Sequence, residues 1–497
     1  MQHVLHHNEV SGDDRVVRAG ETCWRVARAG RFAPIVDAAP YFAHLRDALL
    51  QARHSVLFIG WEFDTRIKLV PDDPIPGLPE ELGPFLSALV ERKRDLEIRV
   101  LQWNLGLVGT IARGTTPLYL LNWMRRRRFT FELDDAHPVG ASHHQKIVVI
   151  DDALAFCGGI DMTDDRWDTN EHQAKDARRR RPSGKLYEPF HDATVAVDGD
   201  AAVALGDLAR ERWQRATGEV VKVPHRGDHD PWPSGLKPLL GDVDVGIART
   251  QPDYHGQAGV HEIEKLYLAA IASSRRHLYI ESQYFASRCI AIALAERLRE
   301  PDGPEIVIVN PNRAKGWLEE TAMGRGRERV LAHLKAADHH GRFRIYRPVS
   351  DDGIPIYVHS KVLIADDRLL KIGSSNLNNR SMGLDTECDV VIEAASTDEK
   401  RAEIAAKITG FRNTLIAEHL GIAPETIAGQ MDETGSMISV IEAQRGEGKR
   451  TLVPIDLPSG PADNILDESE LLDPEAPEPI WKAAGHALIA RLRRRRK

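Results

Sequence analysis

Two short motifs in the chain combine an imidazole, an ammonium and a carboxylate at identical spacing. Each has the form His-x-Lys-x-x-x-x-Asp, and the second copy follows the first after 359 − 144 = 215 residues. The motif residues are His144, Lys146 and Asp151 in the first copy and His359, Lys361 and Asp366 in the second. A neutral imidazole can attack phosphorus, a protonated imidazole can donate a proton to a leaving alcohol, and lysines can neutralise phosphate oxygens. The two sets therefore predict a phosphodiester site with one histidine on each side.

A glycine turn follows each motif at the same distance. Gly158–Asp161 follows the first motif, and Gly373–Asn376 follows the second. The apolar runs behind both histidines predict strands, and residues two apart share a strand face. The histidine and lysine of each copy should therefore point the same way, with the aspartate at the strand end. Ser374, Asn376 and the backbone amides of the turns are expected to bind phosphate oxygens.

The duplication extends beyond the motifs. Apolar, β-branched runs at 55–61 and 96–103 have counterparts at 277–283 and 304–310, and stretches of helical period lie beside them. Strands that alternate with helices indicate the α/β class, and the offset is too long for a solenoid repeat. We expect two homologous α/β/α sandwich halves with mixed sheets packed face to face and the active site at their interface.

The domain boundaries follow from composition. We expect the two halves at 1–222 and 242–421, and a linker rich in Pro, Gly and Asp at 223–241. A C-terminal tail at 422–497 ends in a short basic helix. Because one chain holds both motifs, we expect a monomer.

Charge and hydropathy narrow the functional classes. The chain has 66 Lys and Arg against 74 Asp and Glu, a net charge of −8, so it lacks the global basic field of a dedicated nucleic-acid binder. The four cysteines are widely spaced and are expected to be reduced thiols. There is no classical export signal and no apolar run of about 18 residues. We expect a cytoplasmic protein or one peripheral to a membrane, although non-classical export would leave no signal.

Both motifs, with their glycine turns, resemble the phospholipase D superfamily over residues 20–421. The resemblance includes Gly60-Trp61, the segment Arg166-Trp167-Asp168 and the stretch Tyr279–Phe285. It implies that His144 is the nucleophile and His359 the general acid, an order that the residue chemistry alone leaves open.

The resemblance also implies an acidic residue on a later strand that orients each histidine, and the candidates are Asp192 and Glu387. Gly159, Ser374 and Asn376 are the candidates for phosphate binding. The first half differs from the second because it has Asp161 where the second has Asn376, and an aspartate would repel phosphate.

By this resemblance the chain is expected to be a phospholipase D that converts phosphatidylcholine-type lipids to phosphatidate and a free alcohol through a phosphohistidine, with phosphatidyl transfer possible. A cardiolipin-synthase-like phosphatidyltransferase is the alternative. A nucleic-acid phosphodiesterase is disfavoured by the acidic charge, and a catalytically silent scaffold by the completeness of both motifs. Because two lysines neutralise the phosphate, we expect no metal or other cofactor.

A cluster of arginines, Arg178–Arg181, lies in an insertion at 169–188 that the second half lacks. A basic loop between catalytic elements could cover the mouth of the active site and contact anionic lipid headgroups at a membrane surface. The alternative is a solvated loop without a function of its own.

Overall fold

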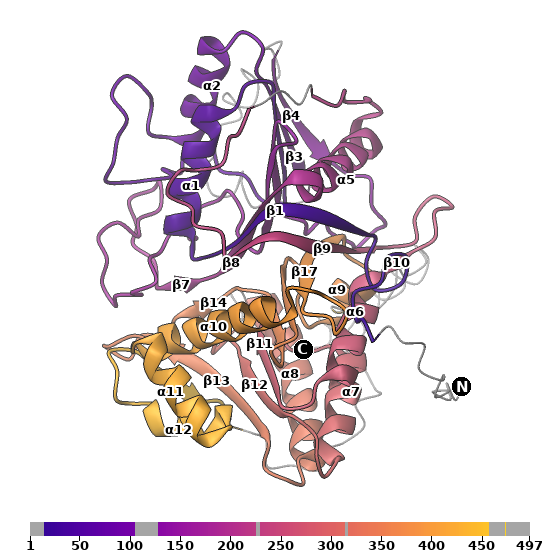
Figure 1. Ribbon diagram of the computed structural model, residues 1–497. Coiled ribbons are helices and arrows are strands. Elements are labelled where there is room, and N and C mark those ends of the chain that lie inside the picture. Colours follow the sequence, from indigo (N-terminus) through magenta and orange to yellow (C-terminus); the bar gives the residue numbers. More distant parts are fainter. Residues whose placement is uncertain (1–13, 105–127, 225–228, 314–316, 457–472, 474–497) are drawn as a thin grey trace, which may run out of the picture.

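The computed structural model describes residues 14–104, 128–224, 229–313, 317–456 and 473 (Figure 1). Strands and helices alternate along both halves, as the sequence predicts. The elements of the first half are β1 (Arg25–Val36), α1 (Ala38–Gln51), β2 (Ser55–Gly60), α2 (Leu82–Arg92), β3 (Glu97–Trp103), β4 (Phe129–Asp134), β5 (Ile147–Ile150), β6 (Leu154–Gly158), β7 (Phe190–His191), β8 (Ala193–Asp198) and α5 (Gly199–Thr217).

The second half follows a similar order, although its short strand precedes the motif strand instead of following it. It comprises β9 (Leu240–Gln251), β10 (Val260–His261), α6 (Glu262–Ser273), β11 (His277–Glu281), α7 (Arg288–Arg299), β12 (Glu305–Val309), α8 (Trp317–Ala337), β13 (Phe343–Val349), β14 (Tyr357–Val358), β15 (Val362–Ala365), β16 (Leu369–Gly373), α9 (Asn379–Gly383), β17 (Glu387–Glu393) and α10 (Arg401–Leu420). After it come α11 (Pro424–Thr434), α12 (Met437–Gln444) and β18 (Thr451–Pro454).

The two sheets have the same strand order, which confirms the duplication. The first runs β4-β3-β2-β5-β6-β8-β1 and the second β13-β12-β11-β15-β16-β17-β9. The outer three strands of each sheet are parallel and the remaining pairs are antiparallel. Both sheets are therefore mixed, as predicted.

The motif strands form the centre of each sheet because they are the most apolar. All residues of β5 (sequence IVVI) and β15 (sequence VLIA) are buried. A short run of β-branched residues suits a strand that is covered on both faces. Each motif lysine directly precedes its strand, so the histidine and lysine lie at the same strand end in both halves.

The halves are joined by strand pairing as well as by packing. β1 pairs antiparallel with β9 from Arg25↔Ile247 to Phe32↔Leu240, so the two sheets are continuous along the boundary between the halves (Figure 1). β6 and β8 also contact β16 and β17 across that boundary. One apolar core, with Val195, Ile372 and Val390 among its buried residues, spans both halves.

Parts of the segments predicted as linker and tail are packed against the two halves. Trp232 and Leu236 are buried against the first-half core, and Leu240 already begins β9. In the tail, β18 pairs antiparallel with β13 and so extends the sheet of the second half. The basic helix predicted at the end of the chain lies outside the described residues.

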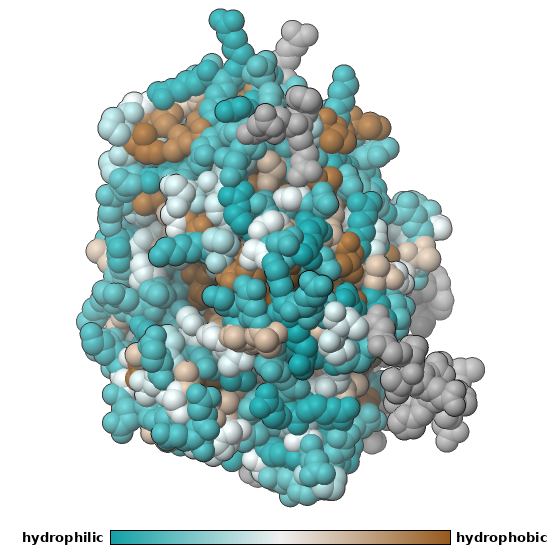
Figure 2. All heavy atoms as spheres, in the orientation of Figure 1, coloured by the Kyte–Doolittle hydropathy of each residue, from teal (hydrophilic) through white to brown (hydrophobic). Residues whose placement is uncertain are grey.

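One face of the molecule can be judged for polarity. The face in Figure 2 is dominated by hydrophilic residues with small apolar patches. In the part of the chain that the structure describes, no helix is long and apolar enough to cross a membrane. All four cysteines are free thiols, as predicted, and three of them are buried.

Candidate active site

Reciprocal backbone contacts place the two motifs against the opposite halves. The amide of His144 donates to the carbonyl of Thr386 at 2.9 Å, and the amide of His359 donates to the carbonyl of His191 at 2.8 Å. The second contact continues the short parallel pairing of β7 with β14. Each acceptor directly precedes one of the predicted orienting carboxylates, so the two contacts are equivalent.

The carboxylates bind the histidines in a crossed arrangement. His144 Nδ1 lies 3.0 Å from Glu387 Oε2, and His359 Nδ1 lies 2.6 Å from Asp192 Oδ2. Glu387 belongs to the second half and Asp192 to the first, so each histidine is held by the half that does not contain it. A ring that is fixed through Nδ1 presents Nε2 on its other side, which is the geometry needed for attack on phosphorus or for proton transfer.

Each motif histidine is within electrostatic reach of both motif lysines. Burial lowers the pKa of His144 and of His359 well below the ordinary value, and both Lys146 and Lys361 lower each of these pKa values further. Burial also lowers the pKa of Lys361 to about 7. Both imidazoles are therefore neutral at neutral pH as long as no anion is bound.

The two lysines have different partners. Lys146 Nζ lies 3.2 Å from Asp161 Oδ2. The other carboxylate oxygen of Asp161, Oδ1, accepts a hydrogen bond from the backbone amide of Trp61 at 3.0 Å. Lys361 Nζ instead donates to the neutral Gln283 side chain at 3.2 Å. Lys146 thus neutralises the negative charge of Asp161, which reduces the expected repulsion between this carboxylate and a phosphate.

Two of the predicted phosphate-binding residues have other partners. Ser374 Oγ donates to Glu387 Oε2 at 2.5 Å, and Ser381 Oγ donates to Oε1 at 2.6 Å. The amide of Gly159 donates to the carbonyl of Ala193 at 2.9 Å. Phosphate binding by Ser374 and Gly159 is therefore not supported, because Ser374 holds the carboxylate that orients His144.

Gly159 has a steric role instead. A Cβ atom at this position would lie 2.1 Å from Asp192 Oδ1, so only glycine allows the carboxylate to approach. Asn376 remains a candidate for phosphate binding. The backbone amide of Asn376 donates to Ser381 Oγ at 3.0 Å. Its buried side-chain oxygen Oδ1 has no hydrogen-bond partner among the described residues.

The motif aspartates lie away from the histidines. Asp151 and Asp366 follow β5 and β15, whereas the histidines precede these strands. Their carboxylates accept hydrogen bonds of 2.7–2.8 Å from successive backbone amides, those of Arg53, His54 and Ser55 for Asp151 and those of Arg275, Arg276 and His277 for Asp366. The assignment of these aspartates to the catalytic set is therefore not supported. They fix the start of β2 and β11 instead.

Sequence reasoning missed Arg166 as a site residue. Its guanidinium lies 5.2 Å from the centre of the Phe190 ring, and this ring lies 5.4 Å from that of His359. Arg166 also contributes to the lowered pKa of His359. The only sequence signal was its place in a segment that carries the family resemblance.

The arginines of the insertion are mostly held by carboxylates. Arg178 pairs with Asp176 at 2.7 Å, and Arg181 pairs with Asp165. Arg179 is buried and pairs with Asp168 at 3.1 Å. These ion pairs show that the cluster stabilises its own loop, and they leave Arg180, which binds a backbone carbonyl, as its exposed member.

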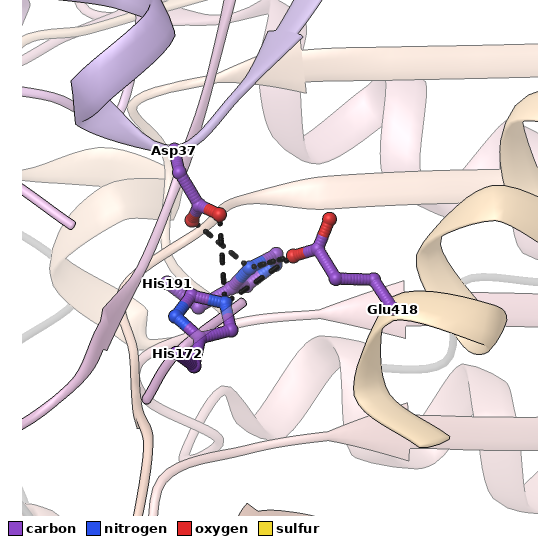
Figure 3. Close-up of side chains that lie close together, drawn as sticks. All are labelled: Asp37, His172, His191 and Glu418. Carbon is purple, nitrogen blue, oxygen red and sulfur yellow. Dashed lines mark hydrogen bonds and ion pairs between the residues drawn. The ribbon is translucent and has the colours of Figure 1, made fainter. Parts of the chain in front are cut away.

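A second group of charged residues lies buried close to the site. Figure 3 shows Asp37, His172, His191 and Glu418 converging from four separate parts of the chain. The nitrogen–oxygen distances between them are 2.9, 3.3, 3.3 and 3.5 Å. Tetrahedral coordination with bonds of about 2.1 Å separates ligand atoms by roughly 3.4 Å. These four residues could therefore hold a divalent cation.

The second ring nitrogen of His172 and of His191 binds a carboxylate outside the cluster, which is also consistent with a metal site. His172 Nδ1 binds Asp168 at 3.0 Å, and His191 Nε2 binds Glu281 at 2.9 Å. Metal-binding histidines are commonly oriented in this way by carboxylates. Alternatively, the negative charge of the two carboxylates is balanced by protonation of the histidines instead of by a cation. Burial alone would lower the pKa of His172, but Asp37 and its other acidic neighbours raise it to about 9. The sequence offered no signal for this cluster, because its members have no ligand spacing.

Comparisons with known proteins agree with the duplication. Residues 48–229 match a family model described as "Phospholipase D", and residues 267–409 match one described as "Cardiolipin synthase, PLD-like domain". The chain is 24% identical to phospholipase D alpha 4 of Arabidopsis thaliana over 78% of this chain and 65% of the plant protein. It is 25% identical to phospholipase D A of Dictyostelium discoideum over 78% of this chain and 35% of that protein. It thus spans less than two thirds of these relatives.

One solved structure has the same fold. The crystal structure of phosphatidylserine synthase from Haemophilus influenzae Rd KW20 aligns with a TM-score of 0.51 at 12% sequence identity. The alignment covers 83% of this chain and 95% of that one. At this level of identity the likeness shows a common architecture of two similar halves.

The close approach of Asp192 to Gly159 can be tested directly. We expect Gly159→Ala to fold but to lose most phosphodiester turnover, because the new Cβ must displace the carboxylate that holds His359. Gly410→Ala is the matched control, since nothing lies within 4 Å of that Cβ. Circular dichroism and turnover should be measured for both. Equal turnover would contradict the orienting role of Asp192.

Cation binding by the buried cluster is also testable. We expect the protein to melt several degrees lower after chelation and to regain its melting temperature with Zn²⁺, because ligand binding stabilises only the folded state. His172→Gln should abolish this difference. If stripped and reloaded wild-type protein melt alike, protons balance the buried carboxylates.

Proposed function

The chain belongs to the phospholipase D superfamily and contains two of its domains, and from this we propose that it hydrolyses phosphatidylcholine-type phospholipids to phosphatidate and a free alcohol. At a coarser level it is a phosphodiesterase or phosphatidyltransferase of that superfamily. One observation carries the proposal. The crossed bonds of His144 with Glu387 and of His359 with Asp192 hold two neutral imidazoles beside the same two lysines.

In the proposed reaction His144 is the nucleophile. Its neutral Nε2 attacks phosphorus, and a nitrogen–phosphorus bond forms as the bond to the headgroup oxygen breaks. His359 donates a proton to that oxygen, and the alcohol leaves. The now neutral His359 takes a proton from water, whose oxygen attacks the phosphohistidine and releases phosphatidate. Both histidines then return to their starting states.

Positive charge stabilises the transition state. Lys146, Lys361 and Arg166 all act electrostatically on His359, and the phosphoryl oxygens gain charge as phosphorus is attacked. The same charges suppress protonation of the free imidazoles. The bound diester anion opposes this effect, so substrate binding itself raises the pKa of His359 and prepares the acid.

Phosphatidyl transfer is the second candidate function. It uses the same phosphohistidine, with an alcohol in place of water in the second step. The match of the second half to a model described as cardiolipin synthase favours this candidate. Incubation with labelled phospholipid, with and without glycerol or phosphatidylglycerol, distinguishes transfer from hydrolysis. A nucleic-acid substrate serves as the control and is expected to remain intact, given the net charge of −8.

The two histidines should be individually essential. We expect His144→Ala and His359→Ala each to lower headgroup release by about 10³-fold or more, because each removes a chemical role that the other cannot supply. His339→Ala changes an exposed histidine and is the control. Rapid denaturation during turnover should leave phosphate on His144. Substantial activity in either variant, or label on serine or aspartate, would overturn the mechanism.

The pH dependence should be bell-shaped, with an acidic optimum for kcat/KM. Below the lowered pKa of the nucleophile the imidazole is protonated and cannot attack. Above the lowered pKa of His359, the proposed acid has no proton to donate. Near pH 7 Lys361 also begins to lose its charge. We expect the basic limb of kcat to lie at higher pH than that of kcat/KM, because bound substrate raises these pKa values. Coincident limbs would contradict this coupling.

A further inference from the structure

Glu281 is a buried carboxylate that joins several parts of the fold. It ends β11, and its side chain is fully buried. Its Oε2 accepts hydrogen bonds from Ser360 Oγ at 2.6 Å and from His191 Nε2 at 2.9 Å. Its Oε1 accepts hydrogen bonds from Tyr279 at 2.6 Å and from His419 of α10 at 2.9 Å. One side chain therefore satisfies four donors.

Two of these donors are neighbours of site residues. Ser360 stands between His359 and Lys361, and His191 directly precedes Asp192. Glu281 thus binds the residue next to each member of the His359–Asp192 pair. The backbone bond from the His359 amide to the His191 carbonyl closes this arrangement. A shift of Glu281 would move both ends of the 2.6 Å bond between His359 and Asp192.

The first half has no counterpart of this residue. Glu281 pairs with Val362 in the second sheet, and at the equivalent register of the first sheet Ile59 pairs with Ile147. Glu387, which orients His144, is held instead by the hydroxyls of Ser374 and Ser381. The two histidines therefore differ in their support, although their motifs are identical.

We propose that Glu281 is a positioning residue for His359, holding Ser360 and His191 so that Asp192 keeps this imidazole aligned for proton donation to the leaving alcohol. The proposal rests on the proposed function, in which His359 is the acid. Gln at this position keeps the size but loses the charge, and its amide nitrogen cannot accept the bonds of Ser360 and His191. Asp192 and His359 then lose their fixed geometry, while His144 and its carboxylate stay in place.

The leaving group provides the test. An alkyl alcohol needs a proton as it departs, whereas p-nitrophenolate leaves without one. In single-turnover experiments with phosphatidylcholine and with the p-nitrophenyl ester of phosphatidate, release of the leaving group reports the first step alone. We expect Glu281→Gln to slow choline release by about 10²-fold, which is the usual size of an acid-catalysis effect. Release of p-nitrophenol should fall only a few fold.

Two further variants separate positioning from a general loss of stability. Glu393→Gln removes another buried carboxylate, which binds the Val16 amide and Arg368, and both rates should stay near wild type. Ser360→Ala removes only one of the four donors, so it should show the same selective loss to a smaller extent even if Glu281→Gln fails to fold. Equal losses on both substrates in the folded variants would overturn the proposal.

A measurement without substrate distinguishes failure of the Glu281 proposal from failure of the proposed function. The short hydrogen bond of His359 Nδ1–H should give a strongly downfield proton resonance, which Asp192→Asn identifies by its loss. We expect Glu281→Gln to move this resonance upfield and Glu393→Gln to leave it in place. If wild-type protein cleaves neither lipid, the proposed function fails while this resonance still reports on Glu281. An unchanged resonance in Glu281→Gln would refute the positioning role.

Discussion

Two histidine–carboxylate bonds that cross between the halves are the interaction on which the rest of the site depends. His144 is held by Glu387 and His359 by Asp192, so each half contains one motif histidine and the carboxylate that orients the other one. Neither half alone has an oriented histidine. The pairing of β1 with β9 and the shared apolar core are therefore requirements of the chemistry, because they bring the two motifs together.

Burial makes this arrangement both effective and costly. The imidazoles, lysines and carboxylates lie in a poorly solvated interface. Burial there lowers the pKa values of both imidazoles and of Lys361, and it raises the pKa of Asp192 to about 6 and that of Glu387 to about 8. An empty site of this kind favours neutral partners. A phosphodiester anion supplies the missing negative charge, so the site reaches its reactive protonation state when substrate is present.

The two halves have diverged in the groups behind their identical motifs. Behind His144, serine hydroxyls hold the orienting carboxylate, and Lys146 has an aspartate beside it. Behind His359 lies a network of buried polar groups around Glu281 and His191, which reaches helix α10 through His419. This difference fits a reaction in which one histidine attacks and the other transfers protons. An acid must keep its alignment in two successive steps, once as donor and once as base.

The sequence by itself determined the duplication and the α/β class, and it predicted the motif strands and the two histidines and two lysines of the site. These features depend on residue type and on the spacing within each motif, which a linear pattern records. Asp192 and Glu387 were predicted only through the family resemblance. Only the tertiary structure decided that the carboxylates bind across the halves, that Ser374 supports Glu387, and that Asp151 and Asp366 bind backbone amides at the far ends of their strands. It also assembled the cluster of Asp37, His172, His191 and Glu418. The crossed histidine–carboxylate bonds join residues 243 and 167 positions apart, and the motif aspartates bind amides 89 to 98 positions away. These contacts depend on how strands pair and how the two halves dock, and no local spacing encodes that.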